Sequence, residues 1–257
     1  MGRVISIFNQ KGGVGKTTTV VNLAAALGKL KKKILVIDID PQGNATSGLG
    51  IDKNSLQNSI YNVMIENADI KNIIYNTTAE NVYIVPSNVE LAGAEIELIE
   101  KENRELVLKN AINEVKNSYD IIFIDCPPSL GLLSINGLSA SDSVIIPIQC
   151  EYYALEGVSQ LMETIMLVKR GLNPQLEIEG VVLSMFDGRT NLSIQVVEEV
   201  KKYFRGKVYT TIIPRNVRLA EAPSHGLSVI DYDTKSKGAE AYTELAEEFL
   251  EILEEEI

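Results

Sequence analysis

The sequence is poor in the residues on which several classes of protein depend. It contains two cysteines, Cys126 and Cys150, and a single histidine, His225. This chain alone therefore cannot build a disulfide framework, a Cys-x-x-Cys metal site or a zinc site of clustered imidazoles. We expect both cysteines to be buried apolar residues and His225 to have a structural role.

Long hydrophobic runs are also absent. No apolar stretch approaches the roughly 20 residues that a membrane-spanning helix needs. The sequence begins with a strand-like segment, so we expect no cleavable leader. We therefore expect a cytoplasmic protein.

Positive charge is scarce in total but concentrated locally. The net charge is -11, which taken globally argues against a nucleic-acid partner. Between Arg189 and Arg218, however, seven basic residues stand against two glutamates, a local charge of +5. The segment from Glu240 to Glu256 has the opposite character, with eight glutamates and no lysine or arginine. Residues 189–218 are therefore the candidate surface for an anionic partner.

The order of the segments predicts an α/β fold. Short β-branched runs alternate with longer stretches of helical period, and most of the runs are apolar throughout, as expected for strands covered by helices on both faces. We expect a doubly wound, mostly parallel sheet in one domain over residues 1–257, because no repeat or Gly/Ser-rich linker marks a boundary. The expected strands are 4–8, 34–39, 82–85, 121–124, 143–148, 178–183 and 208–213. The expected helices are 17–30, 104–116, 156–168, 192–204 and 239–252, with an irregular helical excursion over 54–75.

The segment after the first expected strand has the composition of a phosphate-binding loop. It reads KGGVGKTT and comprises Lys11, Gly12, Gly13, Val14, Gly15, Lys16, Thr17 and Thr18. The glycines allow backbone N–H groups to face phosphates, and the following helix adds its positive N-terminal end. Lys16 supplies a charge between the β- and γ-phosphates, and Thr17 supplies a hydroxyl for Mg²⁺. Gln10 stands where the usual pattern has its first glycine, and Lys11 is an additional lysine.

Three aspartates follow apolar strands. Residues i and i+2 share a face of a strand, so Asp38 and Asp40 can both point toward the crevice where doubly wound folds bind ligands. Asp40 precedes Pro41 and is the better candidate to position an attacking water or contact Mg²⁺, whereas Asp38 is equally compatible with a turn or cap. Asp125 ends the strand IIFID in a Walker B arrangement, which brings a carboxylate to the Mg²⁺ shell.

The pattern favours ATP as the nucleotide. No Asn-Lys-x-Asp sequence is present, so the guanine-reading device of common GTPases is missing. No histidine or cysteine nucleophile lies near the carboxylates, and direct attack by water is then the simplest chemistry. No arginine finger is evident, so we expect slow hydrolysis until a partner completes the site.

Five motifs carry a family resemblance. KGGVGKTTT, IDIDPQGN, FIDCPPS, FDGRTNLS and IPRNVRLAEAPSHG occur in this order and cover nearly the whole chain. Together they resemble the ParA/Soj chromosome-partitioning ATPases of the MinD/ParA superfamily, the P-loop NTPases with a deviant Walker A motif. That motif requires a lysine ahead of the two glycines, which here is Lys11.

The resemblance implies roles for single residues. It implies an Mg²⁺-dependent ATPase in which two ATP-bound subunits face each other and Lys11 reaches the nucleotide of the partner. Lys16 and Thr17 then serve phosphate and Mg²⁺, Asp40 positions the hydrolytic water beside the metal, and Asp125 is the Walker B carboxylate. The resemblance also puts Pro214 and Asn216 beside the adenine.

The resemblance also implies partners. Members of the family bind double-stranded DNA without sequence preference as ATP dimers, through basic residues that match Arg189 and Arg218. A ParB-like centromere-binding protein stimulates hydrolysis and releases the dimer from DNA. Because the dimer binds DNA, the resemblance implies a cytoplasmic protein associated with the nucleoid. Lys201, Lys202 and Arg205 either extend the DNA surface or form the solvated face of a helix.

Other proteins with this loop remain as alternatives. MinD-type ATPases dock on anionic lipid through a basic C-terminal helix, but EEFLEILEEEI carries the wrong charge, so no membrane partner is expected. Nitrogenase iron proteins hold a [4Fe-4S] cluster with two cysteines from each subunit, but Cys126 and Cys150 lack glycine-rich flanks. A metabolic ATP-dependent ligase or kinase would leave the basic segment unexplained.

Overall fold

The computed structural model describes residues 2–151 and 156–255. The strands are β1 Arg3–Ile7, β2 Ile34–Asp38, β3 Tyr75–Asn76, β4 Val82–Val85, β5 Ile121–Asp125, β6 Ser143–Gln149, β7 Glu177–Phe186 and β8 Val208–Pro214. The α-helices are α1 Lys16–Lys29, α2 Asn44–Gly48, α3 Ile60–Glu66, α4 Leu91–Glu97, α5 Val107–Asn113, α6 Leu132–Ala140, α7 Glu156–Gly171, α8 Asn191–Tyr203, α9 Val217–Glu221, α10 Val229–Tyr232 and α11 Lys237–Glu255. The 3-10 helices are η1 Ile70–Ile73, η2 Leu98–Glu100, η3 Lys116–Ser118 and η5 Ala222–His225.

The strands of the described residues form one eight-stranded sheet in the order β3-β4-β2-β5-β1-β6-β7-β8. Every pairing is parallel except that of β3 with β4 at one edge. The strands β1, β2 and β5 end in register, because Asp125 pairs with both Ile7 and Asp38. The loops that follow these three strands therefore begin at one edge of the sheet, where doubly wound folds bind their ligands.

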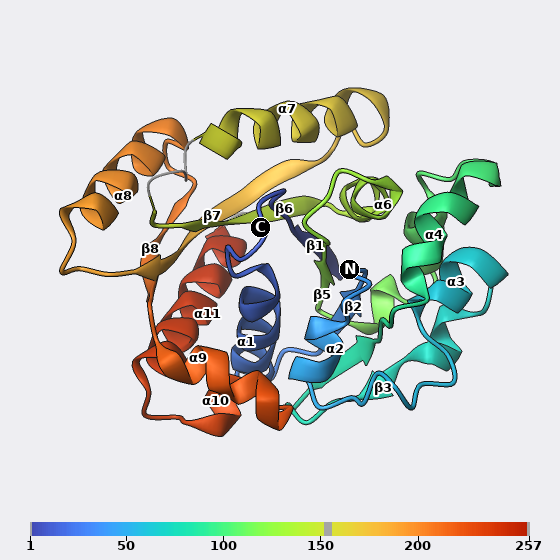
Figure 1. Ribbon diagram of the computed structural model, residues 1–257, viewed down its shortest axis with the longest axis horizontal. Coiled ribbons are helices and arrows are strands. Elements are labelled where there is room, and N and C mark those ends of the chain that lie inside the picture. Colours follow the sequence, from blue (N-terminus) through green and yellow to red (C-terminus); the bar gives the residue numbers. More distant parts are fainter. Residues whose placement is uncertain (1, 152–155, 256–257) are drawn as a thin grey trace.

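Helices cover both faces of the sheet (Figure 1). The helices α3 to α8 pack on one face, and α1, α2, α10 and α11 pack on the other. Successive residues of a strand point to opposite faces, so Leu35 and Ile37 join one core while Ile34 and Val36 join the other. This explains the uninterrupted apolar strands of the sequence and confirms the predicted fold class.

The main differences from the predicted elements have local causes. Residues 104–116 were expected to form one helix, but α5 covers only Val107–Asn113. Asn136 of α6 accepts a hydrogen bond from Leu108 N–H (3.1 Å) and donates one to the carbonyl of Arg104 (2.7 Å). These backbone groups are thus satisfied by a neighbouring helix instead of by an earlier helical turn. The excursion at 54–75 contains α3 and η1.

Several helices had no periodic signal in the sequence. α6 is buried on nearly all sides, so its apolar residues show no stripe. α2, α9 and α10 are five residues or fewer, too short for a period to appear. Within the described part of the chain, no helix combines the length and the apolar character needed to cross a membrane.

Candidate active site

The glycine-rich loop joins β1 to α1 at the edge where β2 and β5 also end. Gly13 (φ 75°) and Gly15 (φ 91°) have left-handed backbones, which residues with a Cβ rarely adopt. Gly15 is the N-cap of α1 and supplies no side chain to its first turn. The first N–H groups of α1 therefore receive no hydrogen bond from an N-cap side chain, an arrangement that suits an anionic ligand.

Lys16 is held inside this loop. Its side chain is buried, and its ammonium donates to the carbonyl of Lys11 at 3.2 Å. Burial lowers the pKa of Lys16, and the charge of Asp125 acts in the opposite direction. An ammonium that is desolvated next to a carboxylate gains from an additional anion, so Lys16 is suited to a phosphate.

Thr17 and Asp125, two of the residues that the sequence assigned to Mg²⁺, lie in contact. The Thr17 hydroxyl donates to Asp125 Oδ2 at 2.7 Å. Asp125 is fully buried, and its Oδ1 atom has no hydrogen-bond partner among the described residues. Burial raises the pKa of Asp125 well above its usual range, Asp38 raises it further, and the bond from Thr17 opposes both. A buried carboxylate with one unpaired oxygen is costly unless a cation or proton meets it.

Asp38 and Asp40 have different surroundings. Both oxygens of Asp38 are used within the chain, since Oδ2 accepts from the N–H (2.9 Å) and hydroxyl (2.7 Å) of Thr46 and Oδ1 accepts from Asp40 N–H (3.1 Å). Burial raises the pKa of Asp38 to about 6 against these hydrogen bonds. Asp40 is 7% exposed and accepts only from Gln42 N–H at 2.9 Å in the described residues. Asp38 is thus the turn carboxylate, and Asp40 is the one available for chemistry.

Asn9, Gln10 and Lys11 at the start of the loop make different contacts. Gln10 Nε2 donates to Thr164 Oγ1 of α7 at 2.9 Å, so its side chain fastens the loop to that helix. Asn9 Oδ1 accepts from Lys11 N–H at 3.0 Å, while Asn9 Nδ2 donates to the carbonyl of Pro147 at 2.8 Å. In the described residues, the Lys11 ammonium has no partner within the chain. Its backbone is fixed and its charge is free to meet another molecule.

Two residues that the sequence did not single out contact the glycine-rich loop and the helix that follows it. Ser184 at the end of β7 donates its hydroxyl to the carbonyl of Val14 at 2.8 Å. The Tyr242 hydroxyl of α11 lies 3.3 Å from the hydroxyl of Thr19. Burial raises the pKa of Tyr242, so this phenol stays protonated. No sequence signal marks either residue, because both contacts join distant parts of the chain.

A cavity of about 440 Å³ opens beside the loop. Its walls include Thr18 and both residues predicted to lie beside an adenine, Pro214 and Asn216. Asn216 caps α9 through Arg218 N–H (2.9 Å). Met185 also lines the cavity, and its φ of 53° is an uncommon backbone conformation for a side chain of this size. The cavity has the mostly apolar wall and the size that a purine base requires.

Comparison with known proteins decides the family. A family model described as an AAA domain matches residues 2–178. The chain is 62% identical over 248 residues to the sporulation initiation inhibitor protein Soj of Bacillus subtilis (strain 168), covering 96% of this chain and 98% of that protein. It is 48% identical to the chromosome-partitioning ATPase Soj of Treponema pallidum (strain Nichols), covering 97% of this chain and 98% of that protein. The chain belongs to the Soj/ParA family of chromosome-partitioning ATPases.

A solved structure shares the fold of this Soj/ParA family member. The crystal structure of cobyrinic acid a,c-diamide synthase from Mycobacterium smegmatis with bound ADP and magnesium superimposes with a TM-score of 0.85. The two sequences are 38% identical, and the match covers 96% of this chain and 93% of that one. The same architecture therefore holds an adenine nucleotide and magnesium in that protein.

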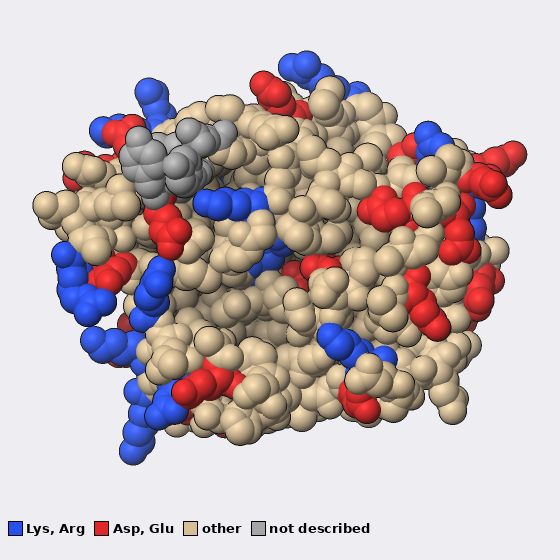
Figure 2. All heavy atoms as spheres, viewed as in Figure 1, with Lys and Arg blue, Asp and Glu red and all other residues tan. Residues whose placement is uncertain are grey.

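The basic residues of this Soj/ParA chain gather at one end of the sheet. Figure 2 shows Lys and Arg side chains concentrated on the side of α8 and β8, and acidic side chains on the side of α3 and α4. The side chain of Arg189 is 88% exposed and pairs with Asp187. Arg218 is 46% exposed and pairs with Glu221 and Asp233. The other three predicted DNA residues, Lys201, Lys202 and Arg205, are exposed at the C-terminal end of α8 and just after it.

The remaining predictions concern cysteine, histidine and the C-terminal helix. Cys126 and Cys150 are buried as expected, and burial raises the pKa of each thiol to about 12. His225 stacks on Tyr232 with ring centroids 5.0 Å apart, which fits a structural role. The apolar face of α11 packs against α1 and β8, so it is used inside the molecule.

Proposed function

We propose that residues 1–257 act as a single domain that binds and hydrolyses Mg·ATP in the edge-of-sheet site. The observation that carries this proposal is the pairing of Thr17 with Asp125 at 2.7 Å, which leaves Asp125 Oδ1 buried and unpaired. Family membership and the adjoining cavity of about 440 Å³ support it.

The residues present fit Mg²⁺. In the described residues no group of three or more His, Cys, Asp or Glu side chains is arranged to hold a metal by itself. Mg²⁺ keeps several waters and phosphate oxygens as ligands and is usually bound through one or two carboxylates of the protein. Thr17, Asp125 and Asp40 are the residues that would hold it, and when bound it would neutralise charge on the phosphates.

The phosphate loop binds the nucleotide in this proposal. Lys11, Gly12, Gly13, Val14, Gly15, Lys16, Thr17 and Thr18 contact the phosphates, and Pro214 and Asn216 contact the adenine. Lys16 acts within its own subunit. Lys11, whose ammonium has no partner within the described chain, acts on the nucleotide of a second subunit, so that ATP joins two copies. Asp40 orients the attacking water.

We further propose that the ATP dimer binds double-stranded DNA without reading its sequence. Arg189 and Arg218 contact backbone phosphates, and Lys201, Lys202 and Arg205 extend the same surface. The concentration of positive charge around α8 in an otherwise acidic protein supports this. A ParB-like centromere-binding protein stimulates hydrolysis and releases the dimer from DNA. Because the ATP dimer binds DNA, the protein is cytoplasmic and associated with the nucleoid in this proposal.

One experiment tests whether ATP controls dimerisation and DNA binding. Light scattering and DNA retention are measured with ATP, with ADP and without nucleotide, in the presence of Mg²⁺. We expect the molecular mass to double, and the protein to be retained on DNA, with ATP but not with ADP or without nucleotide. A protein that stays monomeric at saturating ATP would refute the dimer, and ATP-dependent retention on anionic liposomes instead of DNA would indicate a membrane ATPase.

The similarity to an amide-forming enzyme raises a second candidate. Cobyrinic acid a,c-diamide synthase shares the fold at a TM-score of 0.85, so the fold alone is compatible with a metabolic ligase. The identity to Soj, 62% over nearly the whole chain, is much higher than the 38% to that enzyme, which favours partitioning. A metabolic ligase would show no ATP-gated retention on DNA.

A further inference from the structure

A second cavity lies beside the nucleotide cavity, between the end of β7 and the start of α8. Its volume is about 520 Å³, and its walls include Arg189, Thr190, Ser193 and Arg215; we call it the α8 groove. None of its lining residues belongs to the glycine-rich loop. Arg215 stands in the basic segment of the sequence, but no motif assigned it a role.

Two arginines enter this groove from different elements. Arg215 follows β8, and its N–H donates to the carbonyl of Phe186 at 3.0 Å, which fixes its backbone against β7. Arg189 lies in the loop between β7 and α8. The side chains are 61% and 88% exposed, so both guanidinium groups are accessible from solvent. Both arginines line the groove, and each guanidinium is a planar fork of N–H donors that suits phosphate oxygens.

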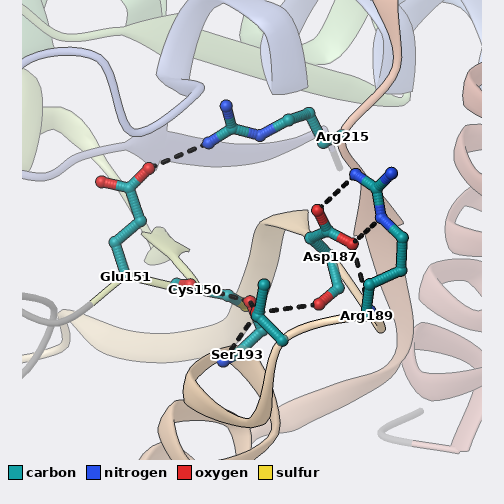
Figure 3. A network of polar contacts seen from close by, with 7 residues as sticks. Cys150, Glu151, Asp187, Arg189, Ser193 and Arg215 are labelled. Carbon is teal, nitrogen blue, oxygen red and sulfur yellow. Dashed lines mark hydrogen bonds and ion pairs between the residues drawn. The ribbon is translucent and has the colours of Figure 1, made fainter.

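Each arginine is held by one carboxylate (Figure 3). Arg215 Nη2 lies 2.9 Å from Glu151 Oε1, and Arg189 contacts Asp187 through Nη2 (2.7 Å) and Nε (2.8 Å). The pKa of Asp187 is lowered to about 2, mainly by the hydrogen bonds from Arg189 and in small part by the charge of Arg215. Positive and negative groups therefore alternate along the groove.

These pairs are weak enough to exchange. Ion pairs between exposed side chains contribute little to stability, because water and salt screen them. Arg215 uses one of its two terminal nitrogens on Glu151, and the rest of its fork is not engaged by a side chain within the described residues. A phosphate brought by a polymer can therefore join or replace the carboxylate with little loss of stability.

The groove also adjoins the nucleotide cavity. Glu151, Met185 and Arg215 line both spaces. A phosphate bound by Arg215 would therefore lie next to the wall of the nucleotide cavity, while Arg189 and the basic end of α8 continue away from it. Exposed basic groups at several places, in the groove and at the C-terminal end of α8, suit an extended polyanion better than a single free phosphate.

We propose that the α8 groove binds a backbone phosphate of double-stranded DNA and that Arg215 contacts it together with Arg189. The proposal rests on the proposed function, of which it assigns one further DNA-contacting residue. Glu151 holds Arg215 in place before DNA arrives and competes with the phosphate for it. The groove thus puts a DNA contact on the same wall as the nucleotide.

The first test removes the guanidinium. Arg215→Gln, Arg215→Lys and wild type are titrated with a fluorescent mixed-sequence duplex at saturating ATP over a range of salt concentrations. We expect Arg215→Gln to lower affinity roughly three- to tenfold and to reduce the slope of log affinity against log salt by about 1 for each phosphate that is no longer neutralised. Arg215→Lys keeps the charge and is expected to keep the slope. Lys71→Gln, on η1 at the opposite end of the sheet, is the matched charge control.

The second test frees the arginine instead. Glu151→Gln is expected to raise DNA affinity by roughly two- to fivefold, which misfolding cannot imitate. The same change made in Arg215→Gln is expected to have no effect, because the carboxylate acts through Arg215. An equal gain in both backgrounds would mean only that a negative charge had been removed near DNA, and it would overturn the proposal.

Two further outcomes are decisive. Binding of a fluorescent ATP analogue is measured for each variant, since Arg215 also lines the nucleotide cavity. If wild type binds DNA with ATP but Arg215→Gln binds it equally well, or fails only because it has lost ATP, the groove proposal is wrong and the proposed function stands. If wild type binds no DNA in any nucleotide state, both are wrong.

Discussion

Lys11 and Lys16 stand in one loop, but their ammonium groups have different surroundings. Lys16 is 7% exposed and donates within the loop, whereas the side chain of Lys11 is half-buried and its ammonium has no partner in the described chain. Sequence alone makes them two similar lysines. Their environments separate a charge that serves its own nucleotide from one that is available to another subunit.

We expect Lys16→Ala to lower ATP affinity by about 100-fold, the equivalent of about 3 kcal/mol for a charged contact to phosphate. Lys11→Ala is expected to bind ATP nearly as well as wild type at concentrations too low for dimerisation, and to remain monomeric when concentrated. Calorimetric titration and light scattering check the two parts. Equal losses of ATP affinity in both variants would contradict the separate roles.

The buried carboxylate of Asp125, which is suited to a cation, lowers the stability of the protein when no cation is bound. Burial raises the pKa of Asp125 and that of Asp38 in the folded protein. The folded state then holds more protons than the unfolded state near pH 5, so this part of the stability is present at low pH and is lost as the pH rises through the folded pKa values. Without nucleotide and Mg²⁺, the two ionised carboxylates weaken the fold at pH 8.

Asp125→Asn is therefore expected to exceed wild type in free energy of unfolding at pH 8 by on the order of 1–3 kcal/mol, and by much less at pH 5. Urea unfolding at both pH values with a metal chelator measures the difference. The exposed Glu102→Gln serves as control and is expected to show no such dependence. A lower stability of Asp125→Asn at pH 8 would argue against an ionised, unpaired carboxylate.

At the scale of elements, α4 and α6 are joined by one carboxylate. The N-cap of α6 is Gly131, which has no side chain to offer. Glu95 of α4 accepts from Leu132 N–H at 2.7 Å and from Leu133 N–H at 3.3 Å, and so caps α6 from outside. Because α6 follows the loop after Asp125, this contact also fixes the far end of that loop.

We expect Glu95→Ala to lower the free energy of unfolding by about 1–2 kcal/mol, the usual effect of losing an N-cap. Chemical denaturation measures it as a shift of the midpoint at unchanged slope. Glu97→Ala removes an exposed carboxylate from the same helix, one that contacts only Tyr61 in the described residues, and is expected to change stability by less than about 0.5 kcal/mol. Equal losses of stability in Glu95→Ala and Glu97→Ala would contradict the capping role of Glu95.

At the scale of the whole molecule, charge is divided between the two ends of the sheet. Seven of the 24 basic residues lie between Arg189 and Arg218, in and around α8 and β8, whereas β3 lies at the opposite edge of the sheet. A protein with a net charge of -11 therefore still has a basic surface that can attract polyanions.

We expect Arg189→Glu to lower DNA affinity at least about tenfold while ATP-dependent dimerisation persists. Lys71→Glu, the control, is expected to leave DNA affinity unchanged; full retention of Arg189→Glu on DNA would exclude the basic surface.

The cycle of assembly and release belongs to the same scale. Asp40→Ala is expected to bind ATP and dimerise but to hydrolyse at least about 100-fold more slowly, because no carboxylate orients the water. The variant then stays on DNA after wild type has left. Phosphate release and the lifetime on DNA measure this, and an Asp40→Ala protein that is monomeric with ATP would remove the proposed role.

The sequence by itself determined the fold class, the family and the position of the glycine-rich loop, because these depend on neighbours in the chain. An apolar run predicts a buried strand, and KGGVGKTT fixes the order of lysines and glycines without reference to any distant residue. For Asp38 the sequence position is compatible with two roles, a ligand-binding residue or a residue that stabilises a turn. Only the hydrogen bonds from Thr46, seen in the structure, identify the second role.

Tertiary structure decided the contacts that cross the sheet. Ser184 meets Val14 across 170 positions of sequence, and Glu95 meets the start of α6 from a separate helix. The α8 groove likewise joins Glu151, Asp187 and Arg215 from different strand ends. No local sequence pattern predicts these contacts. The order and register of the strands determine which distant residues lie side by side, and both are set only when the sheet forms.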